Sequence, residues 1–83
     1  LFDQDIKLTK HEFNLLYHFM ENPNKVISRE SLMEQLYPYA EKIVSDRTID
    51  AHIKKLRKKI EENPAEPQRI ITVRGMGYKF VAE

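Results

Sequence analysis

Apolar residues recur every three or four positions in three stretches of the chain, which is the spacing of one face of a helix. In the first stretch, Thr9 and Glu12 fit the capping box T-x-x-E, in which each side chain satisfies a free backbone N–H of the other residue. We expect the helix that follows to end near residue 21, because Pro23 disfavours helix in the residue before it. Its expected buried face consists of Phe13, Leu16, Tyr17 and Met20.

Two further helices are predicted downstream of this one. Ser28 is the expected N-cap of the second helix, which covers residues 29–37 and ends at Pro38. Its expected buried residues are Leu32, Met33 and Leu36. The third helix is expected to start at a cap on Ser45 or Asp46 and to run to about residue 62. Its apolar stripe consists of Ile49, Ile53, Leu56 and Ile60.

The C-terminal part of the chain has the pattern of a β-hairpin. Residues 70–73 and 78–81 are rich in strand-forming side chains, and they flank the turn signal Arg74-Gly75-Met76-Gly77. Tyr78 and Phe80 alternate with Lys79, so we expect both rings to pack in the core. A broken alternation in residues 1–8 predicts a short strand. Three helices and a C-terminal hairpin give the outline of a winged helix.

The third helix is strongly cationic on the face opposite its aliphatic stripe. Residues 47–60 hold six basic residues and one acidic residue, whereas the rest of the chain holds eight basic and twelve acidic residues. The outward face consists of Arg47, Ala51, Lys54, Lys55 and Lys58. Like charges four residues apart destabilise a helix by about 0.2–0.5 kcal/mol per pair. Such a segregation of charge therefore favours a polyanionic partner, and the small Ala51 would let it approach closely.

The residues by themselves leave two other uses of this helix open. The first is an ordinary solvated helix whose charges have no partner. The second is a membrane-surface or calmodulin-binding helix, which would need large apolar anchors such as Trp or Phe. The apolar face here has the width of an intramolecular core instead.

Composition restricts the classes of protein further. With 83 residues, of which 41% are apolar, the chain is expected to form one small domain. It has no cysteine, which suits a reducing cytosol, and no apolar run approaches the roughly 20 residues that cross a bilayer. Because the chain starts at Leu1 and not at Met, we expect it to be part of a longer protein.

No motif for catalysis or metal binding is recognisable. The chain lacks a nucleophile elbow, a paired carboxylate motif and a P-loop. The three histidines, His11, His18 and His52, have no metal-ligand spacing with one another or with carboxylates. We therefore expect a protein that is not an enzyme and that uses neither a metal nor a cofactor.

Four blocks of the sequence resemble, in order, the signature blocks of the OmpR/PhoB family, the DNA-binding effector domains of bacterial two-component response regulators. They are LTKHEFNLL, NKVISRESL, DRTIDAHIKKLRKKIE and ITVRGMGYKF, and the resemblance covers residues 6–81. It implies an α+β winged helix-turn-helix fold over residues 1–83, with three helices, a C-terminal hairpin wing and a truncated N-terminal sheet. The receiver domain with its phospho-accepting Asp is expected to be absent from this chain.

The resemblance also implies how DNA is contacted, with the third helix in the major groove and the wing at the adjacent minor groove. The residues in base-contacting positions are Ala51, Lys55, Arg57 and Arg74. Those in phosphate-contacting positions are Arg29, Tyr37, Arg47, Thr48, His52, Lys54, Lys58 and Thr72. Arginine is more usual in the family at positions 54 and 55, so a softer or different base preference is expected from lysine, which lacks the planar fork.

Family membership would bring further partners. The connection between the second and third helices contacts RNA polymerase in the family, and the matching residues here are Pro38, Tyr39, Ala40, Glu41 and Lys42. A tolerated loop insertion is the alternative for these residues. Receiver phosphorylation is expected to promote dimeric binding to direct repeats of double-stranded DNA in the bacterial cytoplasm, in association with the nucleoid. The competing interpretation of the whole domain is a module whose basic face binds an acidic protein or RNA.

Overall fold

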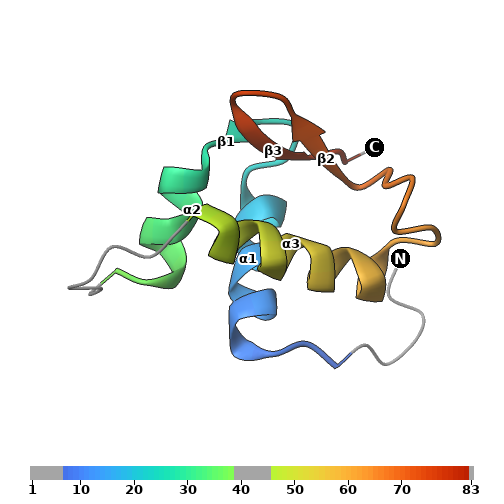
Figure 1. Ribbon diagram of the computed structural model, residues 1–83, viewed down its shortest axis with the longest axis horizontal. Coiled ribbons are helices and arrows are strands. Elements are labelled where there is room, and N and C mark those ends of the chain that lie inside the picture. The colour runs from blue at the N-terminus through green and yellow to red at the C-terminus, as the bar shows by residue number, and fades with distance from the viewer. Residues whose placement is uncertain (1–6, 39–45, 83) are drawn as a thin grey trace.

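The computed structural model describes residues 7–38 and 46–82, which form helices and strands in the order α1, β1, α2, α3, β2, β3 (Figure 1). The helices are α1 (Lys10–Glu21), α2 (Arg29–Leu36) and α3 (Asp46–Ile60). The strands are β1 (Val26–Ile27), β2 (Ile70–Val73) and β3 (Gly77–Phe80). The predicted α+β class, with three helices and a C-terminal hairpin, is therefore confirmed.

The first two helices begin at the predicted caps. The Thr9 Oγ1 accepts a hydrogen bond from the Glu12 N–H at 3.2 Å, and the Glu12 carboxylate accepts one from the Thr9 N–H at 2.9 Å. The Ser28 hydroxyl accepts from the Ser31 N–H at 3.1 Å. In α3, the predicted cap at Ser45 lies outside the described residues, and Asp46 is already helical. Helix α2 ends one residue earlier than predicted, and α3 ends two residues earlier.

The hairpin is completed by a third strand that the sequence did not predict. Strand β3 lies between β1 and β2, and both pairs are antiparallel. Ile27 pairs with Tyr78 in one ladder, and Thr72 pairs with Tyr78 in the other. Strand β1 has only two residues, which is too short for apolar and polar positions to alternate recognisably. Strand β1 follows α1 and pairs with β3 of the hairpin before the chain enters α2.

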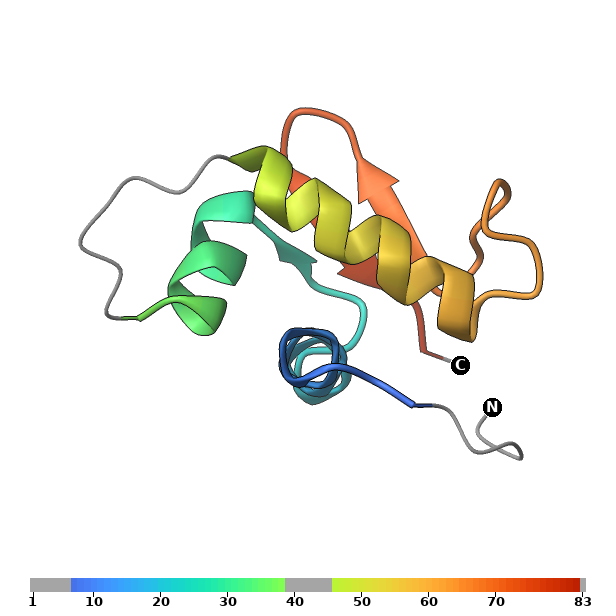
Figure 2. The same cartoon turned by 60° about the horizontal axis from the view of Figure 1, so that its bottom comes forward.

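The core lies between the three helices and the sheet. The largest side chains that are fully buried are Leu15, Phe19, Leu32, Ile49, Ile53, Leu56 and Ile70. The predicted burial of the aliphatic stripe of α3, and of Tyr78 and Phe80 in the hairpin, is confirmed. Figure 2 shows α1 almost end-on, with α3 crossing above it and α2 beside it. Helix α3 therefore contacts both other helices along its buried side.

The predicted buried face of α1 was wrong in three of its four residues. Phe13, Tyr17 and Met20 are about half exposed, and the Phe13 and Tyr17 rings stack on the outside with their centroids 6.1 Å apart. The buried residues of α1 are Glu12, Leu15, Leu16 and Phe19. Apolar residues cover much of this helix, so its sequence contains two candidate stripes at helical spacing.

The buried stripe of α1 includes a carboxylate, that of Glu12. Burial by itself would raise the pKa of Glu12, but Lys59 of α3 and the Thr9 N–H lower it below its usual value. Glu12 can therefore remain charged at the edge of the core, because its Oε1 atom accepts hydrogen bonds from both the Lys59 ammonium and the Thr9 N–H. The ion pair between Lys59 and Glu12 joins the C-terminal half of α3 to the first turn of α1.

The loop between α3 and β2 is held by Glu61, which is 8% exposed. Its carboxylate accepts hydrogen bonds from the backbone N–H groups of Gln68 at 3.0 Å, Arg69 at 3.0 Å and Ile70 at 2.9 Å. Several N–H donors on one carboxylate compensate for its burial. This cluster fixes the start of β2 relative to the end of α3.

The short strand predicted for residues 1–8 falls mainly on residues 1–6, which lie outside the described part of the chain. The two remaining residues, Lys7 and Leu8, belong to no strand. Leu8 is partly buried and packs against the core.

Gly77 is the point where the hairpin comes closest to the junction between β1 and α2. Its φ is +140°, and a Cβ atom at this position would lie 2.1 Å from the carbonyl oxygen of Ile27 and 2.9 Å from the Cα of Ser28. Both are backbone atoms, so neither can turn aside as a flexible side chain would. Because Ser28 caps α2, this contact sets the spacing between the hairpin and the start of that helix.

Gly77→Ala is expected to lower the free energy of unfolding by about 2 kcal/mol or more, because overpacking costs about 1–3 kcal/mol and the unfavourable φ adds to it. Gly75→Ala is the matched control, since Gly75 has a φ of +74° but no atom within 4 Å of the added Cβ. It should cost only the conformational part, about 1 kcal/mol. Urea unfolding of the two variants measures the difference, and equal losses would contradict the steric role of Gly77.

Candidate nucleic-acid interface

The cationic face predicted for α3 is turned towards solvent. Arg47, Ala51, Lys54, Lys55 and Lys58 are all exposed, while the stripe on the opposite side is buried. The buried stripe prevents α3 from rotating about its own axis, because any rotation would expose isoleucine and place lysine in the core. The cations are therefore presented as a fixed row along the helix.

Asp50, the one acidic residue in residues 47–60, connects α3 to two other elements. Its carboxylate accepts a hydrogen bond from the Nε of Arg29, at the start of α2, at 3.0 Å. The hydroxyl of Tyr78, in β3, donates to the same oxygen. Burial and the Asp50 carboxylate raise the pKa of Tyr78, and the same carboxylate raises the pKa of Arg29. Asp50 thus holds α2, α3 and the hairpin in one arrangement.

Arg57 forms a second connection between α3 and the hairpin. Its Nε and Nη2 donate to the carbonyl oxygen of Ile70 at 3.1 and 2.7 Å, and Nη2 also donates to Thr72 Oγ1 at 2.9 Å. The guanidinium lies 5.5 Å from the centroid of the Tyr78 ring. The family resemblance gave Arg57 a base contact and Thr72 a phosphate contact. In the structure, the two side chains bind each other, and Arg57 would have to give up three hydrogen bonds to reach a base.

Three rings meet on the other flank of α3. The hydroxyl of Tyr37, the C-cap residue of α2, lies 2.9 Å from His52 Nε2. His11 of α1 completes the group, with its ring centroid 5.0 Å from that of His52 and 4.8 Å from that of Tyr37. Burial, followed by the neighbouring His11 and Lys55, lowers the pKa of His52 below its ordinary value of 6.5. Two predicted phosphate-contacting residues, Tyr37 and His52, are thus joined directly.

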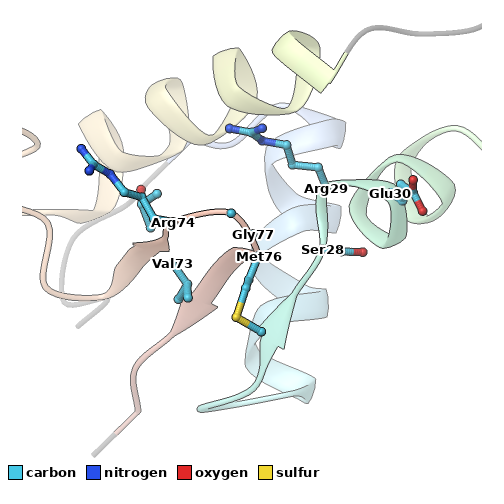
Figure 3. A pocket seen from close by; sticks show the side chains of 9 residues that line it. Ser28, Arg29, Glu30, Val73, Arg74, Met76 and Gly77 are labelled. Carbon is cyan, nitrogen blue, oxygen red and sulfur yellow. The ribbon is translucent and has the colours of Figure 1, made fainter.

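A cleft of about 310 Å³ separates the start of α2 from the tip of the hairpin. In Figure 3, Arg29 extends from the start of α2 towards the hairpin, whereas the Arg74 side chain leaves the hairpin turn in the direction away from Arg29. The lining residues are Ser28, Arg29, Glu30, Thr72, Val73, Arg74, Gly75, Met76 and Gly77. The cleft thus contains two arginines and one carboxylate, Glu30, and the Arg29 side chain is already hydrogen-bonded to Asp50.

Some of the remaining predicted site residues lie in the described part of the chain and others lie outside it. Arg29, Arg74 and Pro38 are exposed, and Thr48 is half-buried on α3. Tyr39, Ala40, Glu41 and Lys42 lie outside the described residues. Among the described residues, no helix is long and apolar enough to cross a membrane, and no group of three or more His, Cys, Asp or Glu side chains is placed to hold a metal ion.

Asp50 and Tyr78 were not predicted to belong to the site. The available signal for Asp50 was that it is the one acidic residue in a basic helix. A polyanion repels a carboxylate, so a carboxylate on a surface that binds a polyanion indicates a structural contact within the protein. Tyr78 was predicted to pack in the core, which is correct for its ring, but no pattern in the sequence indicates the partner of its hydroxyl group.

Comparisons with known proteins point to one family. A family model described as "Transcriptional regulatory protein, C terminal" matches residues 3–80. The sensory transduction protein RegX3 of Mycolicibacterium smegmatis is 42% identical over 77 residues, covering 93% of this chain and 33% of RegX3. Regulatory protein VirG of Agrobacterium tumefaciens is 47% identical over 79 residues, covering 95% of this chain and 29% of VirG. The chain therefore spans about a third of the length of the curated relatives it matches.

Solved structures show the same likeness. The response regulator DrrB of Thermotoga maritima, an OmpR/PhoB homologue, superimposes with a TM-score of 0.83 at 43% identity, covering 93% of this chain and 34% of DrrB. The DNA-binding domain of RstA from Klebsiella pneumoniae, solved in complex with the RstA box, gives a TM-score of 0.82 at 32% identity. That match covers 95% of this chain and 77% of the RstA domain.

Tyr78→Phe is expected to lower the free energy of unfolding by about 1–2 kcal/mol, because it removes a hydrogen bond to a charged acceptor at the junction of α2, α3 and the hairpin. Tyr17→Phe is the matched control, since Tyr17 is 54% exposed on α1, and its loss should stay within about 0.5 kcal/mol. Urea unfolding measures both. A Tyr78→Phe variant as stable as the Tyr17→Phe variant would contradict the structural role of Asp50.

Proposed function

This chain belongs to the family of C-terminal domains of OmpR/PhoB-type transcriptional regulatory proteins, and from that premise we propose how it binds duplex DNA and reads its sequence. Helix α3 lies in the major groove, and the β2–β3 hairpin reaches the adjacent minor groove. The observation that carries this proposal is the fixed, exposed row of cations on α3, with Ala51 in its middle and an isoleucine-rich stripe buried behind it. A helix of this diameter fits the major groove of B-DNA, which is about 12 Å wide.

Base contacts in this arrangement fall to three residues. Ala51 allows the helix backbone to come close to the base edges, and its methyl group suits contact with a thymine methyl. Lys55, one turn further along the same face, can reach guanine O6 and N7 as a point donor, without the bidentate fork of arginine. Arg74, at the hairpin turn, suits a narrow minor groove with its enhanced negative potential.

Phosphate contacts surround these base contacts. Those on α3 are Arg47, Thr48, His52, Lys54 and Lys58. Tyr37 supports the contact made by His52 through their hydrogen bond. Arg29 faces the cleft between α2 and the hairpin, which a DNA strand passing from the major to the minor groove would cross. The free N–H groups at the start of α2 add to its attraction for a phosphate.

Arg57 and Thr72 take a different role in this proposal. Their hydrogen bonds to each other and to the Ile70 carbonyl make them positioning residues, which set the angle between α3 and the hairpin. Asp50 has the same role through Arg29 and Tyr78. A fixed angle between the two reading elements lowers the ordering cost of binding both grooves at once.

The partners of the whole protein follow from the family and extend this proposal. RNA polymerase would contact the connection at residues 37–45, including Pro38, and a receiver domain would control pairing with a second protomer on direct repeats. The domain acts in the bacterial cytoplasm and has no catalytic role of its own. Residues 1–83 form one winged-helix domain in this proposal.

A protein- or RNA-interaction module is the competing function for the same basic face. The structural likeness to the RstA domain, which was solved with its DNA box, favours duplex DNA. The narrow helix face with a small residue at its centre also suits a deep groove better than a flat protein surface. A-form RNA has a deep and narrow major groove that side chains cannot read.

Salt titration on duplex DNA tests the binding mode. The logarithm of the association constant should fall linearly with the logarithm of salt concentration, by about 0.9 for each phosphate neutralised. With several exposed cations on α3, the slope should correspond to several phosphates. A structured RNA of equal length is the comparison ligand, and tighter binding to it at every salt concentration would favour the competing function.

Base contacts and phosphate contacts should differ in their effect on specificity. On a site selected from a random duplex pool, Lys55→Ala should cost about 1–3 kcal/mol of binding free energy and relax one base position, whereas Arg47→Ala should weaken all sequences about equally. Lys10→Ala, at the start of α1, is the control and should bind as the parent does. Fluorescence anisotropy against single-base variants of the site gives the answer, and an unchanged base preference in Lys55→Ala would remove Lys55 from base reading.

A further inference from the structure

The group of His11, Tyr37 and His52 brings together side chains from α1, the C-cap of α2 and α3, and two of them are imidazoles. The centroids of the two imidazole rings are 5.0 Å apart, and the Tyr37 hydroxyl lies 2.9 Å from His52 Nε2. His11 Nδ1 is buried without a hydrogen-bond partner. Such a buried nitrogen is unusual among polar atoms in folded proteins, so the group invites a functional explanation.

The geometry permits one positive charge in this group but opposes two. His52 can pair with Tyr37 either as an acceptor in its neutral form or as a donor when it is protonated. Its protonation therefore does not require the Tyr37 contact to break. Protonation of both rings would place two like charges 5.0 Å apart in a partly buried site, where their repulsion is strong.

The charges around His52 come from every helix packed on it. Helix α1 contributes His11 and Glu12, the C-cap of α2 contributes the Tyr37 hydroxyl, and α3 contributes Lys55. Burial, His11 and Lys55 lower the pKa of His52, while Glu12, itself paired with Lys59, raises it. The net direction is downward, so the free domain keeps His52 neutral near pH 7.

We infer that duplex DNA binding draws one proton onto His52, and that His11 sets the pH at which this occurs. The inference rests on the proposed function, which places a DNA phosphate beside His52. A phosphate brings a negative charge that favours the imidazolium, so the DNA-bound state holds more protons than the free state. By linkage, affinity for DNA then rises as the pH falls, with one proton as the upper limit.

The same group has the opposite effect on the stability of the free domain. A histidine whose pKa is lower in the folded state than in the unfolded state is protonated more readily when unfolded. Its contribution to stability is fully present above pH 6.5 and is lost as the pH falls through 6.5 towards the lower folded-state value. Acidification to about pH 6 therefore weakens the free domain while it strengthens the DNA complex.

The experiment measures proton uptake directly. Affinity for a 25-base-pair duplex selected from a random pool is measured from about pH 6 to 8 at constant ionic strength, and calorimetry in two buffers of different ionisation enthalpy counts the protons taken up. The parent domain should bind more tightly at the acid end, by at most tenfold per pH unit, and should take up a fraction of one proton. His52→Gln should bind with nearly pH-independent affinity and no uptake.

Two further variants isolate the role of each ring. His11→Gln removes the repelling neighbour, so the pH dependence should remain but move to higher pH. His18→Gln, on the same helix but outside the ring group, is the matched control and should behave as the parent does. The ring resonances of His52, followed by NMR in the free and DNA-bound domain, should show a midpoint that moves upward on DNA binding.

The possible outcomes distinguish a failure of this inference from a failure of the proposed function. Proton uptake that persists in His52→Gln, or a His52 midpoint that DNA leaves unchanged, overturns the inference even if DNA is bound normally. A parent domain that binds duplex DNA with no uptake and no pH dependence also overturns it, while the proposed function stands. Absence of duplex binding at every pH and at low salt is a failure of the proposed function itself.

Discussion

The burial of one aliphatic stripe on α3 is the constraint on which the rest of the molecule depends. In a domain of 83 residues the core is small, and Ile49, Ile53 and Leu56 are among its few fully buried large side chains. Their burial fixes the rotation of α3 about its axis, and it thereby also fixes the direction in which the lysines on the opposite face point. The orientation of the cationic row is thus a consequence of hydrophobic packing and not of any interaction that the cations make.

The rotation of α3 about its axis does not determine where the hairpin lies. Polar contacts between α3 and the hairpin determine that position. Asp50, Arg57 and Glu61 each connect α3 or its C-terminal end to β2 or β3. Gly77 adds a steric limit on the other side, because the hairpin backbone there touches the junction that precedes α2. The angle between helix and hairpin is therefore determined by several contacts with different chemistry.

Charge in this domain is divided between residues that hold the fold together and residues left for a partner. Arg57 and Lys59 lie in the same basic run as Lys54, Lys55 and Lys58, yet Arg57 binds the hairpin and Lys59 pairs with Glu12. The planar fork of arginine suits the double contact to one carbonyl, and the long stem of lysine reaches across to α1. Arg57 and Lys59 are therefore held by contacts within the fold, whereas Lys54, Lys55 and Lys58 are exposed.

The helices, the caps of the first two helices, the hairpin and the cationic face could be predicted from the sequence, because they depend on local periodicity and on residues a few positions apart. The Thr9 and Ser28 caps and the stripe of α3 were all predictable in this way. Which stripe of α1 faces inward could not be predicted, because two stripes were available and the inward one packs against α2 and α3, where Glu12 meets Lys59, 47 residues away. Only the tertiary structure decided that β1 joins the sheet and that Arg57 binds Ile70 and Thr72, because these partners meet only when the chain has folded. The histidine pair is of the same kind, because 41 residues separate two rings that lie side by side.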